Sequence, residues 1–550
     1  MPIAFILCSI ILGFVILVLT LIPGEKKAPP FDMPFPVYII LKIGLLLLFI
    51  FLLFYRVDEV PIPYHSDEAG AVYDGYCLAN YHCDRFGVRF PVYFMNFGTH
   101  GSSALYGYSA ALMFTLFGYS ILSARLSAIL LAVLSVIAIS AAVRRDKGKT
   151  ESILILMFFC ILPFSIMHSR WGLDAYLLFP MITISCALLY FAIFSEKTIC
   201  YIISGLVFGL TLYSYSVSYV IIPVFLGVNL IFLLIIKKIK WRQIFALGIP
   251  LFFLALPLIL MIAVNNGYIP EIRTRFFSVP KLETYSASVI NLQNVVDNLS
   301  LNSTNIFYRL FVDDFLIYNV IPKFGTMYYV SIPLILFGFV ISIRNLIRSI
   351  SEKQYGLDFM MTALFIIVLL LNLIVEDTNV NRLCALYLPM IYYLAIASYE
   401  ILSRKKIAAV ITLAAFFILF VFFIRYYFKD FNKELDTSPL IGSITELGEA
   451  VNFADSVNKN DELIYILDPL QTYVYTMLIK GIDPFTFNEQ KILSYDYYVK
   501  VVGHYRFRLD AVMPECIYIF RDRTKMPENL DEFGFAVKKF GSFWVYYPEF

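Results

Sequence analysis

Charged residues are scarce in this 550-residue sequence. Asp, Glu, Lys and Arg make up 15% of it, whereas soluble domains carry about 25%. The formal net charge of +2 carries no information about nucleic-acid binding. The sequence has no P-loop, no D-x-D triplet, no C-x-x-C pair and no H-E-x-x-H motif. A phosphate-binding loop, the usual metal–nucleotide-sugar device and a zinc site therefore have no support.

Cysteine is also scarce, with eight residues in the whole chain. Most of them fall in or beside long apolar runs, where a thiol is most simply an apolar filler. Cys77 and Cys83 are close in sequence and are the two that could form a disulfide, which leaves Cys516 without a partner. The cysteines therefore do not form a disulfide framework.

Apolar runs of about 20 residues are abundant, and this is the length that an α-helix needs to cross a bilayer. Hydrophobic residues make up 60% of the chain. We predict a polytopic all-α membrane protein with about twelve transmembrane helices and no cleaved signal peptide. The predicted spans are 3–22, 36–55, 120–143, 152–167, 173–194, 199–215, 217–236, 244–263, 326–346, 358–375, 384–402 and 407–424.

The loops between the predicted spans alternate in charge. Every second loop is basic, and basic loops are typical of the cytoplasmic side. The clusters are Lys26–Lys27, Arg144–Lys149, Lys197, Lys237–Arg242, Arg344–Lys353 and Arg404–Lys406. The long loops 56–119 and 264–325 and the tail after 424 are then extracytoplasmic. The apolar stretch 104–118 is short, and we interpret it as a helix in the outer interface.

The last 120 residues differ in pattern from the rest. Residues 440–454 have helical periodicity, and "ELIYIL", "CIYIF" and "FGSFWVYY" are typical of strands. In "DPLQTYVYTMLIKG", Asp468 is a candidate N-cap and Gly481 follows the end of a helix. We predict a transmembrane module over 1–428 and a C-terminal extracytoplasmic α/β domain over 429–550.

Polar residues gather at the predicted outer ends of the spans. Tyrosines and single arginines at helix ends are often interface anchors. The adjacent acids Asp67 and Glu68 in "YHSDEAG" are different, because acids gain nothing from anionic headgroups. The candidate site therefore comprises Asp67 and Glu68 as catalytic residues and, as substrate-binding residues, His65, Arg125, His168, Arg170, Asp174, Tyr215 and Arg382.

A carboxylate beside arginines at a lipid–water boundary suits transfer from a lipid phosphate. The acid can accept a proton from an acceptor hydroxyl as general base. Arginine can hold the leaving phosphate in a bidentate fork. Nucleotide sugars are absent outside the cytoplasm, so such an enzyme needs a donor carried by a lipid.

The order of motifs "HSDEAG", "GVRFPVYF", "LYGYSAALMFTLFGYSILSARL", "MHSRWGLDAYLLF" and "LYSYSVSYVIIP" resembles one known family. It is that of GT-C glycosyltransferases of the dolichyl-phosphate-mannose protein mannosyltransferase and aminoarabinose transferase type. The resemblance covers residues 36–260 and, less specifically, 358–402.

The resemblance implies inverting transfer of a sugar from a polyprenyl phosphate outside the cytoplasm. It implies that Asp67 is the base, with Glu68 as its partner. Arg170 and Arg382 would bind the phosphate, and Asp174 would support Arg170. An additional N-terminal span and the long tail depart from the family's minimal pattern, and they leave the acceptor open: a protein, a glycolipid or a cell-wall polymer. No cofactor is predicted. Metal dependence is left open, because Asp67 and Glu68 could hold a divalent ion, although the sequence offers no further ligand set for one.

Two other classes of protein fit the same composition. A transporter would have ionisable residues at the bilayer midplane and an internal repeat, and neither is evident in the sequence. A sensor would need a cytoplasmic output, yet the basic loops are short. A transporter of a lipid or small solute is the alternative we retain.

Overall fold

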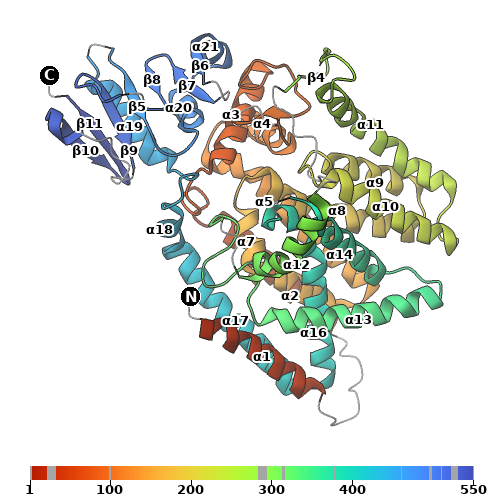
Figure 1. The fold of residues 1–550 in the computed structure, drawn as a ribbon. Helices are drawn as coiled ribbons and strands as arrows, with labels where there is room; N and C mark the ends of the chain where they lie inside the picture. Colours follow the sequence, from red (N-terminus) through yellow and green to blue (C-terminus); the bar gives the residue numbers. More distant parts are fainter. Residues whose placement is uncertain are drawn as a thin grey trace. The chain divides into compact units, whose positions relative to one another are not determined.

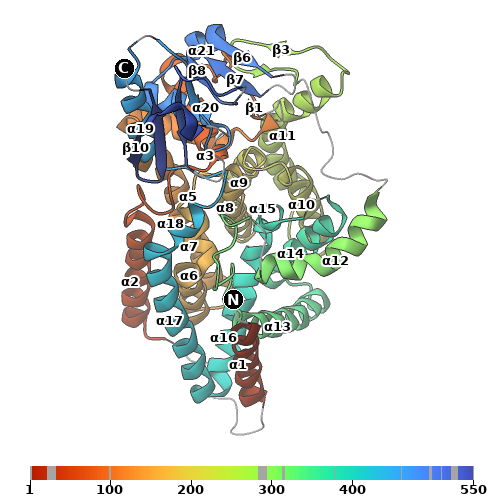
Figure 2. The ribbon, with the colours of Figure 1, turned by 60° about the vertical axis from the view of Figure 1, so that its left-hand side comes forward.

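A computed structural model describes most of the chain in two compact units (Figures 1 and 2). The described residues are 3–21, 33–97, 101–282, 294–312, 316–376, 378–459, 461–494, 498–509, 511–521 and 530–548, so Lys26 and Lys27 lie outside them. Unit 1 comprises Met1–Tyr55, Ala128–Leu256 and Ser288–Lys429. Unit 2 comprises Arg56–Ser127, Pro257–Ala287 and Asp430–Phe550.

Unit 1 is a bundle of apolar helices. Helices α8 and α9, α13 and α16, and α2 and α6 pack against each other as neighbours. Gly338 permits the close approach of α13 to α16, because a Cβ there would meet the carbonyl of Tyr393. Its helices are α1 Ile3–Leu21, α2 Phe35–Phe54, most of α5 Ile121–Asp146, α6 Lys149–Ile161, α7 Pro163–Ser169, α8 Asp174–Ser195, α9 Thr198–Thr211, α10 Ser218–Ile235, most of α11 Trp241–Asn265, α12 Val295–Phe311, α13 Ser331–Ser351, α14 Leu357–Ile374, α15 Val380–Leu383, η3 Cys384–Leu386, α16 Tyr387–Arg404 and α17 Lys406–Lys429.

The predicted spans all coincide with apolar helices, although their number is not settled at twelve. Among the described residues, nine helices are long and apolar enough to cross a bilayer. A tenth results if α6 and α7, which meet at a 62° bend before Pro163, form one span. Helices α1 and α9 are apolar but shorter. The protein is therefore a polytopic helical membrane protein, as predicted. The stretch 104–118 forms the short helix α4 Leu105–Phe117, below the length that crosses a bilayer.

The part of unit 2 that precedes the tail is built on two helices, α3 Ser66–Tyr81 and α4. They approach closely at Gly75, where an added Cβ would lie 2.9 Å from the carbonyl oxygen of Gly107. Short antiparallel pairs complete this part: β1 Phe94–Met95 with β2 Gly101–Ser102, and β3 Ile272–Arg273 with β4 Ser278–Val279.

The tail contributes an α/β fold to unit 2, as the strand patterns predicted. Its seven-stranded sheet has the order β10-β11-β9-β5-β8-β7-β6, with β5 parallel to β8 and β9 and the remaining pairs antiparallel. The elements are α18 Phe431–Leu435, α19 Ile444–Val457, β5 Ile464–Ile466, α20 Thr472–Lys480, α21 Pro484–Gln490, β6 Lys491–Leu493, β7 Val499–Val502, β8 Tyr505–Arg506, β9 Ile517–Phe520, η5 Leu530–Phe533, β10 Ala536–Phe540 and β11 Phe543–Tyr547.

One predicted helix start in the tail is wrong. Asp468 does not cap a helix, because α20 begins at Thr472 after Gln471, which adopts a left-handed conformation. The Asp468 carboxylate instead accepts a hydrogen bond from the backbone N–H of Arg521, at 3.4 Å. The helix end is as predicted, with Gly481 in the left-handed conformation that glycine favours.

The possible disulfide between Cys77 and Cys83 is not formed. Both residues are buried free thiols. Cys77 lies inside α3, and Cys83 forms an antiparallel bridge with Arg89 in the loop that follows. Burial raises the pKa of the Cys83 thiol to about 11, so it is protonated at neutral pH.

Candidate functional site

The segment "YHSDEAG" forms the start of helix α3 in unit 2. His65 is the N-cap, and its Nδ1 accepts a hydrogen bond from the backbone N–H of Asp67, at 3.1 Å. Asp67 and Glu68 occupy the first turn, where the positive end of the helix dipole stabilises carboxylates. This helix was not among the predicted elements, although two acids in a first turn are a known sign of a helix start.

The two adjacent acids have opposite environments. The side chain of Asp67 is 49% exposed, and one of its carboxylate oxygens lies 3.7 Å from Nδ1 of His65. The side chain of Glu68 is fully buried. Consecutive residues in a first turn point in different directions, so one acid meets solvent while the other enters the protein.

Glu68 is held by Arg125, which projects from the first turns of α5. Its Nε and Nη2 donate to the two carboxylate oxygens of Glu68, at 2.8 and 2.9 Å. Nη1 of Arg125 also donates to the carbonyls of Val57 and Pro61, at 2.8 and 2.9 Å. The guanidinium is fully buried, so one side chain joins α5, the start of α3 and the loop that precedes it.

The tail supports the same segment through backbone contacts. Tyr64 and Gly442 exchange two backbone hydrogen bonds, of 2.8 and 3.1 Å. The hydroxyl of Ser66 lies within hydrogen-bonding distance of the carbonyls of Leu440 and Leu470, at 2.9 and 2.8 Å. The hydroxyl of Tyr475 donates to the carbonyl of Tyr64, at 2.6 Å. No sequence pattern pointed to these contacts, because backbone pairing between segments almost 400 residues apart leaves no local signal.

A second buried ion pair anchors α3 further along. Arg85 and Asp74 are both almost fully buried, and Nη2 of Arg85 lies 2.9 Å from Oδ2 of Asp74. Nη1 of Arg85 donates to the hydroxyl of Tyr473 in α20, at 3.1 Å. No sequence pattern predicted this network, because neither Asp74 nor Arg85 stands in a recognisable motif.

His65 is neutral in this environment. Burial lowers the pKa of its imidazole below the ordinary value of 6.5, and the nearby carboxylates of Asp67 and Glu68 only oppose this effect. A neutral ring agrees with its role as acceptor, because Nδ1 must carry a lone pair to accept from Asp67.

Two of the predicted residues in unit 1 lie in the packed interior. Arg170 is fully buried and donates to the carbonyls of Leu52, Leu53 and Tyr55. These are carbonyls at the end of α2, which a helix leaves without intrahelical partners. His168 packs its ring against Phe164 and Tyr176, with ring centroids 4.0 and 3.9 Å apart. Both arrangements stabilise the bundle.

The other predicted residues of unit 1 come together. Asp174 begins α8, Tyr215 lies between α9 and α10, and Arg382 lies in α15. Tyr215 interacts with the charge of Asp174 and with that of Arg382, to which it is also hydrogen-bonded. An acid, a phenol and a guanidinium from three separate segments are therefore neighbours.

The part of the chain that the structure describes contains no candidate metal-binding cluster. There, no three side chains of His, Cys, Asp or Glu lie close enough together to hold an ion.

Comparisons with known proteins agree with the fold. Residues 102–266 match the family described as dolichyl-phosphate-mannose-protein mannosyltransferase. The crystal structure of ArnT from Cupriavidus metallidurans bound to undecaprenyl phosphate is 10% identical, with a TM-score of 0.52 over 93% of this chain and 98% of that chain. The oligosaccharyltransferase AglB from Archaeoglobus fulgidus, in complex with an inhibitory peptide and a dolichol-phosphate, is 12% identical, with a TM-score of 0.45 over 81% of this chain and 63% of that chain. No curated protein sequence matches.

The match of residues 102–266 includes Arg125, Arg170, Asp174 and Tyr215, but it begins after Asp67. The ArnT likeness extends over nearly the whole of both chains, so it includes the additional tail. The resemblance predicted from the motifs is thereby supported: residues 102–266 match the family model, and the fold of the chain is like that of ArnT.

Proposed function

We propose that this protein is an integral-membrane glycosyltransferase that moves a sugar from a polyprenyl-phosphate donor to an acceptor hydroxyl, with inversion at the anomeric carbon. The observation that carries the proposal is the separation of the two acids in α3. Glu68 is buried and fixed by Arg125, whereas Asp67 is half exposed on a rigid first turn. A general base needs this combination of access and fixed position.

In the proposed reaction, Asp67 accepts the proton of the acceptor hydroxyl as its oxygen attacks the anomeric carbon. The bond between that carbon and the phosphate oxygen breaks, and the polyprenyl phosphate leaves with the electron pair. Attack opposite the leaving group gives inversion. The donor supplies the energy, so the step requires no nucleotide.

Arg382 is the residue we assign to the donor phosphate, as part of its cluster with Asp174 and Tyr215. A guanidinium can neutralise the charge that develops on the departing phosphate. Arg125 and Arg170 receive positioning roles instead, since their guanidinium groups bind Glu68 and backbone carbonyls. His65 is assigned to capping α3, and His168 to packing.

We place the reaction on the extracytoplasmic face. Unit 2 collects the first loop, the start of the loop 264–325 and the tail, which are the segments that the basic loops predict to share that face. The tail 429–550 is then a supporting domain for the catalytic loop. A direct test is cysteine labelling in intact cells with a membrane-impermeant maleimide, in a Cys8→Ser background because Cys8 is exposed. Phe276→Cys, at a side chain that is 82% exposed, should react, and Lys353→Cys should not.

The activity is tested with purified full-length protein in lipid nanodiscs. It is supplied with radiolabelled polyprenyl-phosphate sugars, one sugar at a time, and with an envelope extract as acceptor. We expect transfer from at least one donor, with the anomeric configuration inverted in the product. Absence of transfer from every donor, together with movement of the labelled lipid across a bilayer, would contradict the proposal and favour the transporter.

A further inference from the structure

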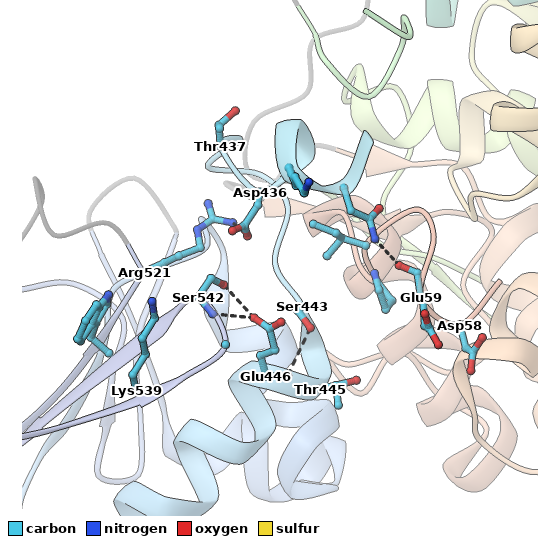
Figure 3. A pocket seen from close by; sticks show the side chains of 16 residues that line it. Asp58, Glu59, Asp436, Thr437, Ser443, Thr445, Glu446, Arg521, Lys539 and Ser542 are labelled. Carbon is cyan, nitrogen blue, oxygen red and sulfur yellow. Dashed lines mark hydrogen bonds and ion pairs between the residues drawn. The ribbon is translucent and has the colours of Figure 1, made fainter. Parts of the chain in front are cut away.

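Unit 2 contains a large pocket between the tail and the loop that leads into α3. It has a volume of about 960 Å³, within the usual range for ligand sites. Figure 3 shows Asp58 and Glu59 on one side of it and Arg521, Lys539 and Ser542 on the other. Its wall includes Ile62 and Pro63, which directly precede "YHSDEAG".

The polar groups of the pocket suit a ligand with many hydroxyls. Carboxylates accept hydrogen bonds and cations donate them, and each hydroxyl of a sugar can do both. The wall also carries hydroxyls and an amide from Thr437, Ser443, Thr445, Ser542 and Asn432. Oδ1 of Asn432 is buried and accepts no hydrogen bond within the part of the chain that the structure describes. A buried acceptor of this kind is costly unless a ligand or water supplies a donor.

The charge of the pocket argues against an anionic ligand. Asp58, Glu59, Asp436 and Glu446 stand against Lys433, Arg521 and Lys539, which leaves a net charge of −1 from four acids and three bases. The cations are also engaged. Arg521 lies 3.3 Å from Asp436, and Lys433 lies 3.2 Å from Asp430. A phosphate or acidic sugar needs a surplus of positive charge, whereas a neutral ligand does not.

An aromatic side chain completes the pocket. Trp544 lies in β11, opposite Lys539 in β10, and the ammonium group of Lys539 is 4.7 Å from its ring centroid. The negative face of an indole attracts weakly positive C–H groups, such as those on one face of a pyranose ring. An indole ring beside an ammonium group, carboxylates and hydroxyls is therefore complementary to a sugar ring.

We infer that this pocket binds a neutral oligosaccharide and is the acceptor subsite of the enzyme. The inference rests on the proposed function, and it narrows the acceptor to a glycan, either free or attached to a larger molecule. In this subsite the glycan lies across Trp544 and along Ile62 and Pro63, which precede the segment that carries Asp67.

Binding of defined oligosaccharides tests the inference. Fluorescently labelled full-length protein in nanodiscs is applied to an array that carries neutral, acidic and phosphorylated oligosaccharides, and the affinity of each positive is then measured in solution. We expect saturable binding of at least one neutral oligosaccharide. Acidic and phosphorylated relatives of the same chain should bind at least about tenfold more weakly. Binding of no neutral glycan, or tighter binding of the acidic one, overturns the inference.

Two variants separate loss of the site from loss of the fold. Thr445→Arg places a long side chain at an exposed position of the wall and should weaken glycan binding by at least about tenfold, with an unchanged unfolding temperature. Trp544→Phe keeps packing against the sheet but offers a smaller platform, and it should bind several-fold more weakly. The matched control Trp241→Phe changes an exposed tryptophan of unit 1 and should bind as the unmodified protein does. Equal binding by the Thr445→Arg protein refutes the inference.

The proposed function and the inference fail in distinguishable ways. Asp67→Asn should retain glycan binding, since Asp67 is not part of the pocket wall. Sugar transfer without saturable glycan binding would refute the acceptor subsite and leave the glycosyltransferase standing. Glycan binding without transfer from any donor would support the glycan site and contradict the enzymatic function.

Discussion

The adjacent acids of α3 provide a sharp test, because the structure gives them opposite roles. Glu68→Gln replaces a carboxylate that accepts two hydrogen bonds from Arg125 with an amide that has one acceptor oxygen. The charge of Arg125 then remains buried without compensation. Breaking a buried ion pair in this way costs about 3–5 kcal/mol. Asp67→Asn alters a side chain that is 49% exposed, and such changes stay within about 0.5 kcal/mol.

The two variants are compared by thermal unfolding of purified protein in one detergent, at matched scan rates because membrane proteins often unfold irreversibly. For a unit of 150–250 residues, each kcal/mol lowers Tm by about 2–4 °C, so we expect Glu68→Gln to lower it by about 6–20 °C. Asp67→Asn should leave Tm within about 2 °C. Equal Tm values for the two variants would refute the assignment of Glu68 as the structural acid and Asp67 as the accessible one.

Three further predictions concern the surroundings of this pair. Burial lowers the pKa of His65 below 6.5, so the unfolded chain binds the proton more readily and the free energy of unfolding falls as pH decreases below about 6.5. His65→Asn keeps a capping acceptor and should reduce that pH dependence. An unchanged stability profile would contradict a buried neutral imidazole. Tyr473→Phe removes the acceptor of an N–H of the buried Arg85, and it should lower the free energy of unfolding, measured with denaturant, by about 1–3 kcal/mol. A change near zero would show that the contact is not formed in solution. Arg382→Ala should raise KM for the donor at least about tenfold, because it removes the proposed phosphate ligand. Arg348→Ala, at an exposed control position, should leave KM unchanged. Equal KM values for the two variants would exclude a role of Arg382 in phosphate binding.

Much of the transmembrane fold could be predicted from the sequence, because a bilayer imposes a simple length rule on apolar helices. The predicted runs coincide with helices from α1 to α17, and the stretch 104–118, predicted as a separate short helix, forms α4 Leu105–Phe117. The rule is less decisive where a helix is bent or short. Pro163 breaks one run into α6 and α7, and α9 is only 14 residues long. The number of spans therefore depends on how such helices lie in the membrane.

The candidate site was predicted unevenly, for a physical reason. Asp67 could be singled out because an acid at a bilayer edge is costly without a purpose. The partner of Glu68 could not, because the bond to Arg125 joins positions 57 residues apart in α3 and α5. Arg170 shows the same limitation: an arginine at the end of a span suggested a phosphate ligand, and the structure shows that its guanidinium caps carbonyls of α2. Residue type and depth do not distinguish these two uses of a guanidinium.

The tail was recognised as α/β from its strands, but its relation to the site was not. Tyr64 and Ser66 are held by backbone groups of Gly442 and Leu440. Because residues of almost any type carry these backbone groups, the contacts leave no pattern in the sequence of the tail. The one incorrect helix start, at Asp468, arose from the same limitation. A local capping pattern was outweighed by a contact with Arg521, which is distant in sequence.

The central claim is that Asp67 is the base of a sugar transfer, and one measurement tests it most directly. The initial rate of transfer from the preferred polyprenyl-phosphate sugar is measured for the unmodified protein and for Asp67→Asn at equal amounts of folded protein. Loss of a general base lowers the rate by about 10²–10⁴-fold, and we predict a decrease in this range with an unchanged Tm. A rate for Asp67→Asn within about twofold of the unmodified protein would contradict the account.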